Sequence, residues 1–172
     1  SWIIDGMEWA ATMDGVRVVS MSLGSGPSDG TDPLSQAVNT LAASTGALFV
    51  IAAGNDGEYG ARTVAAPAAA DAALAVGAVD DNDGLAPFSS RGPRMTDYAL
   101  KPEIAAPGVE ISAARAGGRD SDAYTTMSGT SMAAPHVAGA AAILVQQHPD
   151  WTGEQIKAAL TGTATDAGHS VY

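Results

Sequence analysis

Ser131 is the residue of this sequence best placed to do chemistry. It lies in TTMSGTSMAAPHVAG, residues 125–139, where an alanine-rich helix is predicted to begin. Glycine and small side chains surround it, and a nucleophilic serine is often presented in this way at a helix start. A serine there is also a common helix N-cap, so its position alone does not establish catalysis. Its hydroxyl needs a general base to become a strong nucleophile.

None of the three histidines is predicted to be that base. His136 follows Ser131 by five residues on the same helix, which puts the two about 140° apart around the axis. We therefore expect His136 to point away from Ser131 and to pack in the core or against another helix. His148 lies just past the predicted helix end and is expected to be a C-terminal cap. His169 belongs to the last residues of the sequence and is expected to be a tail residue.

Composition describes a folded, acidic chain of 172 residues, the size of one ordinary domain or a large part of one. The 19 acidic and 8 basic residues give a net charge of −11, which disfavours nucleic acid and anionic membranes as partners. The absence of cysteine excludes disulfides, thiol catalysis and zinc-thiolate sites. No apolar run approaches the roughly 18 residues that span a bilayer, and the first residues do not have the pattern of a signal peptide.

The first half of the sequence predicts alternating helices and strands. Apolar residues recur at helical spacing within residues 1–15, and a β-like alternation follows from Val16 to Gly24. Asp32 is predicted to cap a helix whose first residue is Pro33, and Gly46 to end it.

The rest of the sequence continues this alternation. The apolar runs Ala47–Ala53 and Ala73–Val79 are typical of strands buried on both faces, and a short strand is predicted near Ile104. Residues 80–108 are otherwise expected to be irregular, and residues 123–129 extended. Helices are predicted from Ser131 to Gln147 and from Thr152 to Leu160, the latter opened by a capping box. The pattern predicts an α/β fold, a three-layer sandwich around a mainly parallel sheet.

Five stretches, in order, resemble the subtilisin-like serine proteases, the subtilases of peptidase family S8. SGTSMAAPHVAGAAA, around Ser131, is similar to the nucleophile signature of that family. SMSLG, VIAAGN and HPDWTGEQIKAALTGTA are similar to its substrate-pairing strand, its oxyanion strand and its terminal helix. LAVGAVDDNDGLAPFSSRGP, followed by LKPEIAAPG, is similar to the stretch before the nucleophile. The resemblance covers essentially the whole chain and implies a subtilisin-like fold, present as its C-terminal part.

The resemblance also implies roles for individual residues. Ser131 would attack the scissile carbonyl, and its amide together with the Asn55 side chain would form the oxyanion hole. Main-chain groups of one segment would pair with an extended substrate, and small residues of a second would form the wall of the S1 pocket. The residues assigned to substrate binding in this way are Ser22, Leu23, Gly24, Ala52, Ala53 and Gly54.

The family order of aspartate, histidine and then serine explains why no base is found here. The resemblance implies that residues 1–172 are a partial subtilase catalytic domain, whose catalytic aspartate and histidine lie in a preceding N-terminal part. The parent protein would be a secreted serine endopeptidase that cleaves polypeptides through an acyl-enzyme on Ser131. The chain by itself is then expected to be inactive, because it carries one triad residue of three.

Three other functional classes compete with this interpretation. A subtilase-like scaffold could bind peptides without cleaving them. The sedolisins have a similar serine motif but use a glutamate base and an aspartate in the oxyanion hole, whereas this chain has Asn55. The α/β-hydrolases require G-x-S-x-G, and here Ala133 occupies the place of the last glycine.

Two further expectations concern metals and self-association. Subtilases often bind structural calcium, and the acidic residues near predicted loops are Asp71 and the segment Asp80–Asp83. Neither has EF-hand spacing, so a solvated loop is favoured and no metal ligand is assigned. A partial parallel sheet would expose an apolar edge, which predicts self-association through exposed sheet surface.

Overall fold

A four-stranded parallel sheet forms the centre of the molecule. The computed structural model describes residues 1–168. The strands are β1 (Val18–Met21), β2 (Leu48–Ala52), β3 (Leu74–Val79) and β4 (Ile104–Pro107), in the spatial order β1-β2-β3-β4. Each strand pairs in parallel with the next one along the chain, so all carboxyl ends meet at one edge of the sheet.

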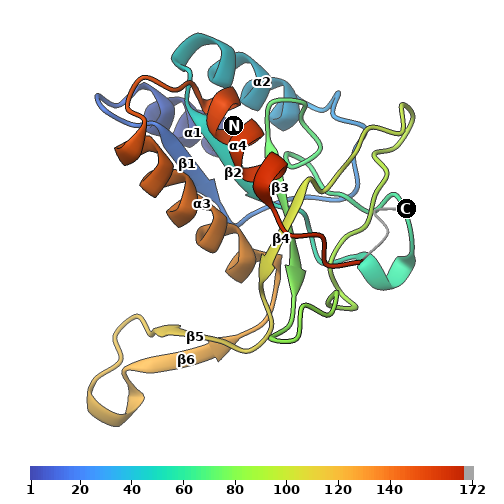
Figure 1. Cartoon of the computed structure of the whole chain (residues 1–172), viewed down its shortest axis with the longest axis vertical. Helices are drawn as coiled ribbons and strands as arrows, with labels where there is room; N and C mark the ends of the chain where they lie inside the picture. Colours follow the sequence, from blue (N-terminus) through green and yellow to red (C-terminus); the bar gives the residue numbers. More distant parts are fainter. Residues whose placement is uncertain (169–172) are drawn as a thin grey trace.

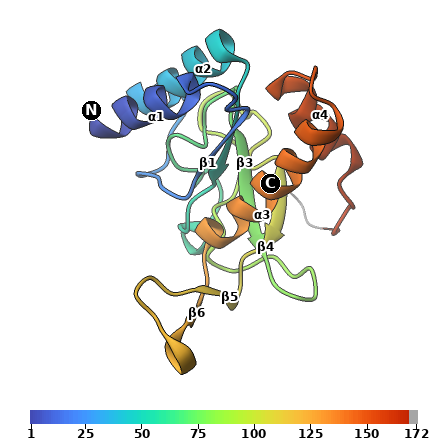
Figure 2. The same ribbon diagram turned by 90° about the vertical axis from the view of Figure 1, so that its left-hand side faces the viewer.

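Helices cover both faces of this sheet. Helices α1 (Trp2–Thr12) and α2 (Pro33–Thr45) pack on one face, and α3 (Thr130–Gln147) and α4 (Gly153–Thr163) on the other, as Figures 1 and 2 show from two directions. The result is the predicted three-layer α/β sandwich. No helix within residues 1–168 is both long enough and apolar enough to cross a membrane.

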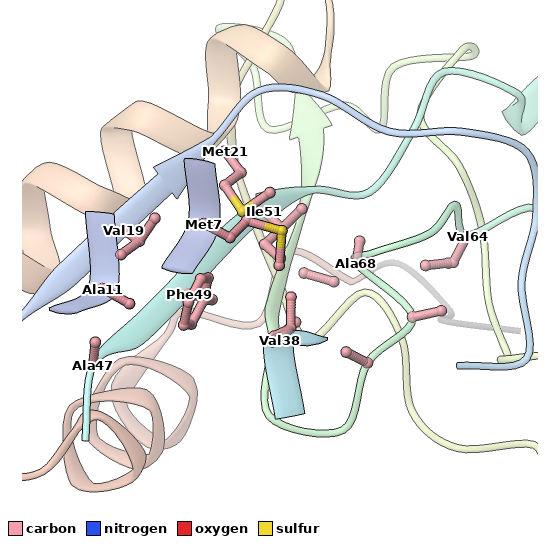
Figure 3. Close-up of a cluster of buried hydrophobic side chains, with 14 residues drawn as sticks. Met7, Ala11, Val19, Met21, Val38, Ala47, Phe49, Ile51, Val64 and Ala68 are labelled. Carbon is pink, nitrogen blue, oxygen red and sulfur yellow. The ribbon is translucent and has the colours of Figure 1, made fainter. Parts of the chain in front are cut away.

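The core on the α1 and α2 side is built around β2. Phe49 and Ile51 point toward Met7 and Ala11 of α1 and Val38 of α2 (Figure 3). The alternate residues of β2 belong to the core on the opposite face. Every residue of β2 and β3 is buried, which confirms that their continuous apolar sequences mark strands covered on both faces.

The opposite core depends on the small residues of α3. Ala133, Ala134, Val137 and Ala141 are buried and lie on one face of this helix, toward the sheet. Because methyl groups are short, the helix axis can approach the strands closely, and α3 packs against all four of them. The nucleophile motif therefore begins a helix that is fixed against the whole sheet.

Local sequence signals set the ends of several elements as predicted. The Asp32 carboxylate accepts the Ser35 amide at 2.9 Å at the start of α2, and Gly46 ends this helix with φ of 72°. Thr152 and Gln155 form the predicted capping box of α4. This helix continues to Thr163 instead of ending at Leu160. Two short 3₁₀ helices lie at Gly57–Tyr59 and Asp120–Asp122.

An antiparallel hairpin leads into α3 and projects from the body of the molecule (Figures 1 and 2). Its strands are β5 (Ile111–Ala114) and β6 (Tyr124–Met127). The sequence predicted extended chain for β6 but did not predict β5. Most residues of both strands are exposed, so they lack the apolar alternation that identifies a half-buried strand.

The sheet edges bear on the predicted self-association. The two most apolar strands, β2 and β3, lie in the interior of the sheet, whereas β1 and β4 are its edges. Both edge strands are only partly buried. Association through a sheet edge stays a prediction. Light scattering at several concentrations tests it, and a single species of monomer mass at every concentration would count against it.

Three cationic side chains fasten the alanine-rich segment 69–73 behind β3. Arg94 donates to the Ala69 carbonyl at 2.7 Å, and the Lys101 ammonium donates to the carbonyls of Ala70 and Ala73 at 2.7 and 2.9 Å. A third cation, Lys157 of α4, donates to two carbonyls of the same segment. Segment 69–73 is thus held through its backbone carbonyls, since four of its five residues are alanines, whose side chains form no hydrogen bonds.

Glu103 balances two of these charges. Its Oε1 atom lies 2.7 Å from the ammonium groups of both Lys101 and Lys157, and its Oε2 atom accepts the Ala75 amide at 2.8 Å. Lys101 is only 2% exposed, and this burial lowers the pKa of Lys101 to about 8, against the raising effect of Glu103.

Replacement of Lys101 by methionine is expected to lower the free energy of unfolding at pH 7 by about 2–3 kcal/mol, because the carbonyls of Ala70 and Ala73 each lose a charged donor and Glu103 loses one of its two cationic partners. The unfolded chain holds the Lys101 proton up to about pH 10.5, so between pH 8 and 10.5 it binds more protons than the folded chain. The stability that Lys101 contributes therefore rises with pH over this interval, and the penalty should grow. Urea unfolding at pH 7 and 9.5 measures both effects, with exposed Arg119→Met as control; equal penalties would contradict the expectation.

Candidate active site

Ser131 is the second residue of α3 and lies beside the end of β1. Its Oγ atom is 3.5 Å from the Ser22 carbonyl oxygen. In return the Ser22 hydroxyl donates to the Ser131 carbonyl at 2.7 Å. The fold thus brings together two predicted site residues that are 109 positions apart in the sequence.

Asn55 caps the helix that carries Ser131. The N-cap residue of α3 is Gly129, which has no side chain to satisfy the first amides of the helix. Instead the Asn55 Oδ1 atom accepts the Thr130 amide at 2.9 Å. In a carboxamide only the oxygen can accept a hydrogen bond, so this contact places Oδ1, and not Nδ2, toward the helix. The Nδ2 amide of Asn55 is then the end that can donate to a ligand.

Thr130 is a site residue that sequence reasoning missed. It is fully buried, and its hydroxyl lies 3.0 Å from Asn55 Oδ1 and 3.2 Å from both the amide and the carbonyl of Gly54. The hydroxyl therefore holds the Asn55 side chain and the Gly54 backbone against the first turn of α3. The sequence feature that could have indicated this role is a threonine between Gly129 and the predicted nucleophile, at the start of the predicted helix.

The loop after β2 has little freedom around Asn55. Gly54 has φ of 109°, and a Cβ atom there would lie 2.8 Å from Ser90 Oγ, so only glycine fits. The Ser90 amide donates to the Gly54 carbonyl at 3.0 Å, and its hydroxyl accepts the Asp56 amide at 3.1 Å. Buried Ser90 thus fixes the backbone on both sides of Asn55.

The residues assigned to substrate binding fall into exposed and buried sets. Ser22, Leu23 and Gly24 follow the end of β1 and are exposed, while Gly54 is half-buried. Ala52 and Ala53 are buried, so their methyl groups belong to the core.

Ala65 is a further residue near this loop. Its methyl group would lie 3.5 Å from a Cβ on Gly24 and 3.1 Å from one on Gly54. The Ala65 methyl group therefore lies between Gly24 and Gly54.

No side chain of the described residues is hydrogen-bonded to Ser131 Oγ as a base would be. Within residues 1–168, the Ser22 carbonyl is the only hydrogen-bond partner of Ser131 Oγ. The prediction that His136 packs in the core or against a helix was wrong: it is exposed, and its ring nitrogen lies 2.8 Å from the Met132 carbonyl of its own helix. Its direction away from Ser131 follows from the helical spacing. His148 is the C-cap of α3, as predicted, and stacks on Trp151; His169 lies outside the described residues.

The acidic residues near the predicted loops have partners within the protein. The Asp80 carboxylate accepts the amides of Asn82 and Gly84, and the Asp71 carboxylate pairs with Arg94. Across the described part of the chain, no three aspartate, glutamate, histidine or cysteine side chains are grouped to hold a metal ion. Structural calcium, which the resemblance suggested through carboxylates and backbone oxygens, stays a prediction.

The geometry suits stabilisation of a negative charge that develops next to Ser131 Oγ. The first-turn amides of α3 point out of the helix, where the helix dipole favours an anion. Asn55 Oδ1 accepts the Thr130 amide, and a Cβ atom on Gly129 would lie 3.6 Å from Asn55 Nδ2 and 3.7 Å from the Ser131 amide nitrogen, so these two nitrogens border the same space. The Ser131 hydroxyl and two nitrogens that can donate thus lie at one helix start.

Comparison with known proteins identifies the family. The model of the Subtilase family, Peptidase_S8, matches residues 1–171. The chain belongs to the subtilase family. The subtilase chain is 44% identical to subtilisin DY of Bacillus licheniformis over 173 aligned positions, which cover all of this chain and 58% of that protein. It is 43% identical to subtilisin E of Bacillus subtilis (strain 168), covering 42% of its length.

Solved structures agree with this assignment. The subtilase chain superposes on the prenylagaramide maturation protease PagA with a TM-score of 0.80 at 30% identity, over 95% of this chain and 57% of the other. Sphericase gives a TM-score of 0.75 at 36% identity, over 94% of this chain and 54% of the other. The chain therefore spans about half the length of the relatives it matches, and the parallel α/β architecture is shared with them.

Proposed function

We propose that the complete gene product is a serine endopeptidase in which Ser131 is the nucleophile and Asn55 an oxyanion donor. The observation that carries this proposal is the capping contact at 2.9 Å between Asn55 Oδ1 and the Thr130 amide. It turns Oδ1 toward the start of α3 and leaves Nδ2 as the end of the side chain that would donate to an oxyanion near Ser131. Membership of the subtilase family supports the same activity.

The reaction would proceed through an acyl-enzyme. Ser131 Oγ attacks the scissile carbonyl carbon while its proton passes to a base, and the carbonyl oxygen becomes an oxyanion held by the Ser131 amide and Asn55 Nδ2. Collapse expels the amine, which takes the proton, and water then releases the acid by the same steps in reverse order. In this proposal a histidine oriented by an aspartate, both outside residues 1–172, supplies the base.

The substrate would be an extended polypeptide. Backbone groups of Ser22, Leu23 and Gly24 are exposed beside Ser131 and could add the peptide as a further strand. Gly54 and Ala65 would bound the S1 pocket, with the buried Ala52 and Ala53 behind them. Such a peptidase is expected to act outside the cell, as the resemblance to the subtilases implies.

A serine-directed phosphonate tests the proposed nucleophile. The complete gene product is incubated with the reagent, digested and analysed by mass spectrometry. We expect stoichiometric modification of Ser131 and loss of chromogenic peptide hydrolysis in parallel. An intact protein that binds peptides but shows neither modification nor hydrolysis would instead be a peptide-binding scaffold, the alternative that lacks a base.

The 172-residue chain on its own is expected to hydrolyse the same peptide poorly. Without a base near Ser131 Oγ, only oxyanion stabilisation and binding remain, worth about 10³–10⁴ over water. The purified chain is compared with the complete gene product at equal concentration. Efficient hydrolysis by the short chain that disappears in its Ser131→Ala variant would contradict this expectation.

A further inference from the structure

Pro135 removes one hydrogen bond from the helix turn that carries the nucleophile. In an α-helix the carbonyl of residue i accepts the amide of residue i+4, so the Ser131 carbonyl should accept from position 135. Proline has no amide proton, and its ring crowds the carbonyl four residues before it. The sequence therefore deprives Ser131 of its usual helical donor.

The Ser22 hydroxyl supplies the missing donor. It comes from the end of β1 and donates to the Ser131 carbonyl at 2.7 Å, the usual distance for a hydrogen bond between two oxygen atoms. The Ser22 carbonyl lies 3.5 Å from Ser131 Oγ, so the two serines face one another through both side chain and backbone. A long-range contact thus replaces a local helical one at the nucleophile.

We propose that Ser22 is a positioning residue, whose side chain fixes the nucleophile through a carbonyl that Pro135 leaves without its helical donor. This inference rests on the proposed function. The backbone beside the Ser22 side chain belongs to the segment proposed to pair with the substrate. One hydrogen bond therefore couples the position of the bound peptide to the position of Ser131 Oγ. A small change in the distance between Ser131 Oγ and the scissile carbonyl carbon reduces the rate strongly, because attack requires these atoms to approach closely and in line.

Neither partner in this contact titrates. The bond joins a neutral hydroxyl to a backbone carbonyl, so its contribution should not change with pH across the active range. Removal of the Ser22 hydroxyl also leaves the backbone groups of residues 22–24 unaltered. A Ser22→Ala variant is therefore expected to lower kcat about tenfold and to change KM less than twofold.

A double-mutant cycle in the complete gene product tests the pairing of Ser22 with Pro135. Alanine at position 135 restores the amide that can donate to the Ser131 carbonyl within the helix. In the Pro135→Ala background, Ser22→Ala should then cost less than twofold in kcat, against about tenfold in the original background. The acylation rate from the burst phase should show the same coupling.

Two further variants sharpen the test. Ser22→Thr keeps the hydroxyl and should retain more than half of kcat, which also covers the case in which Pro135→Ala does not fold. Ser44→Ala removes an exposed hydroxyl that bonds a carbonyl of α2, and should leave activity unchanged.

The outcomes separate the two proposals. Equal losses from Ser22→Ala in both backgrounds, or equal losses from Ser22→Ala and Ser22→Thr, overturn the positioning role while phosphonate labelling of Ser131 upholds the peptidase. Absence of labelling and hydrolysis in the unaltered protein overturns the proposed function, and the positioning role with it.

Discussion

Replacement of Ser131 by alanine is expected to lower kcat of the complete gene product roughly a millionfold, a magnitude taken from the same substitution in subtilisin. The physical reason is that the substitution removes the nucleophile itself, and the hydrogen-bond partner of Oγ in the described residues is a backbone carbonyl, which cannot take its place. Without a nucleophile the reaction must proceed by direct attack of water, helped only by binding and the oxyanion donors.

Initial rates with a chromogenic peptide measure this loss, after purification that removes traces of other peptidases. Ser44→Ala, an exposed serine on α2, is the matched control and should retain full activity. Circular dichroism should show the same thermal unfolding for both variants. Residual hydrolysis within a hundredfold of the unaltered protein would exclude Ser131 as the nucleophile.

Replacement of Asn55 by alanine is expected to lower kcat by about 10²–10³ with little change in KM, the range known from the oxyanion asparagine of subtilisin. The Nδ2 donor would bond the oxyanion of the transition state more strongly than the uncharged carbonyl of the substrate. Loss of that donor therefore raises the barrier without weakening substrate binding, and kcat carries the effect.

The capping contact gives Asn55 a second role that the same experiment separates. Its Oδ1 atom holds the Thr130 amide, so its removal also loosens the first turn of α3. A loss through disorder of the loop would raise KM and lower the unfolding temperature. Asn82→Ala, in an exposed loop, is the matched control. A large rise in KM with kcat preserved would make Asn55 a structural residue only.

Much of the framework could be predicted because its signals are local. Continuous apolar runs identified β2 and β3, since only strands covered on both faces are so uniformly apolar. Asp32, Gly46 and the capping box at Thr152 marked helix ends through bonds that span a few residues. The subtilase motifs assigned Ser131 and Asn55, and the fold brings both to the start of α3.

The remaining features depend on contacts between distant segments. Burial of the Thr130 hydroxyl against Gly54 joins residues 76 apart, which no local pattern reports. The exposure of His136 follows from which face of α3 meets the sheet. Strand β5 is held by its partner β6 alone, so its own sequence contains little strand signal. The pairing of Ser22 with a carbonyl opposite Pro135 becomes visible only when β1 and α3 are adjacent.

The cations that hold segment 69–73 also bear on the order in which the chain can fold. Lys157 lies 86 positions after Asp71, whose carbonyl it binds, and Arg17 donates to the carbonyl of Pro149, 132 positions later. Because these contacts join distant parts of the chain, the entropy lost in closing the long loops between them is lost before the contacts form and stabilise the fold. During synthesis β1, β2 and β3 emerge from the ribosome well before α4, so segment 69–73 can first be bound by Arg94 and Lys101 and gains its bonds to Lys157 only when α4 has emerged. We therefore expect the packing of segment 69–73 behind the sheet to be completed late in folding, when Lys157 of α4 reaches its carbonyls.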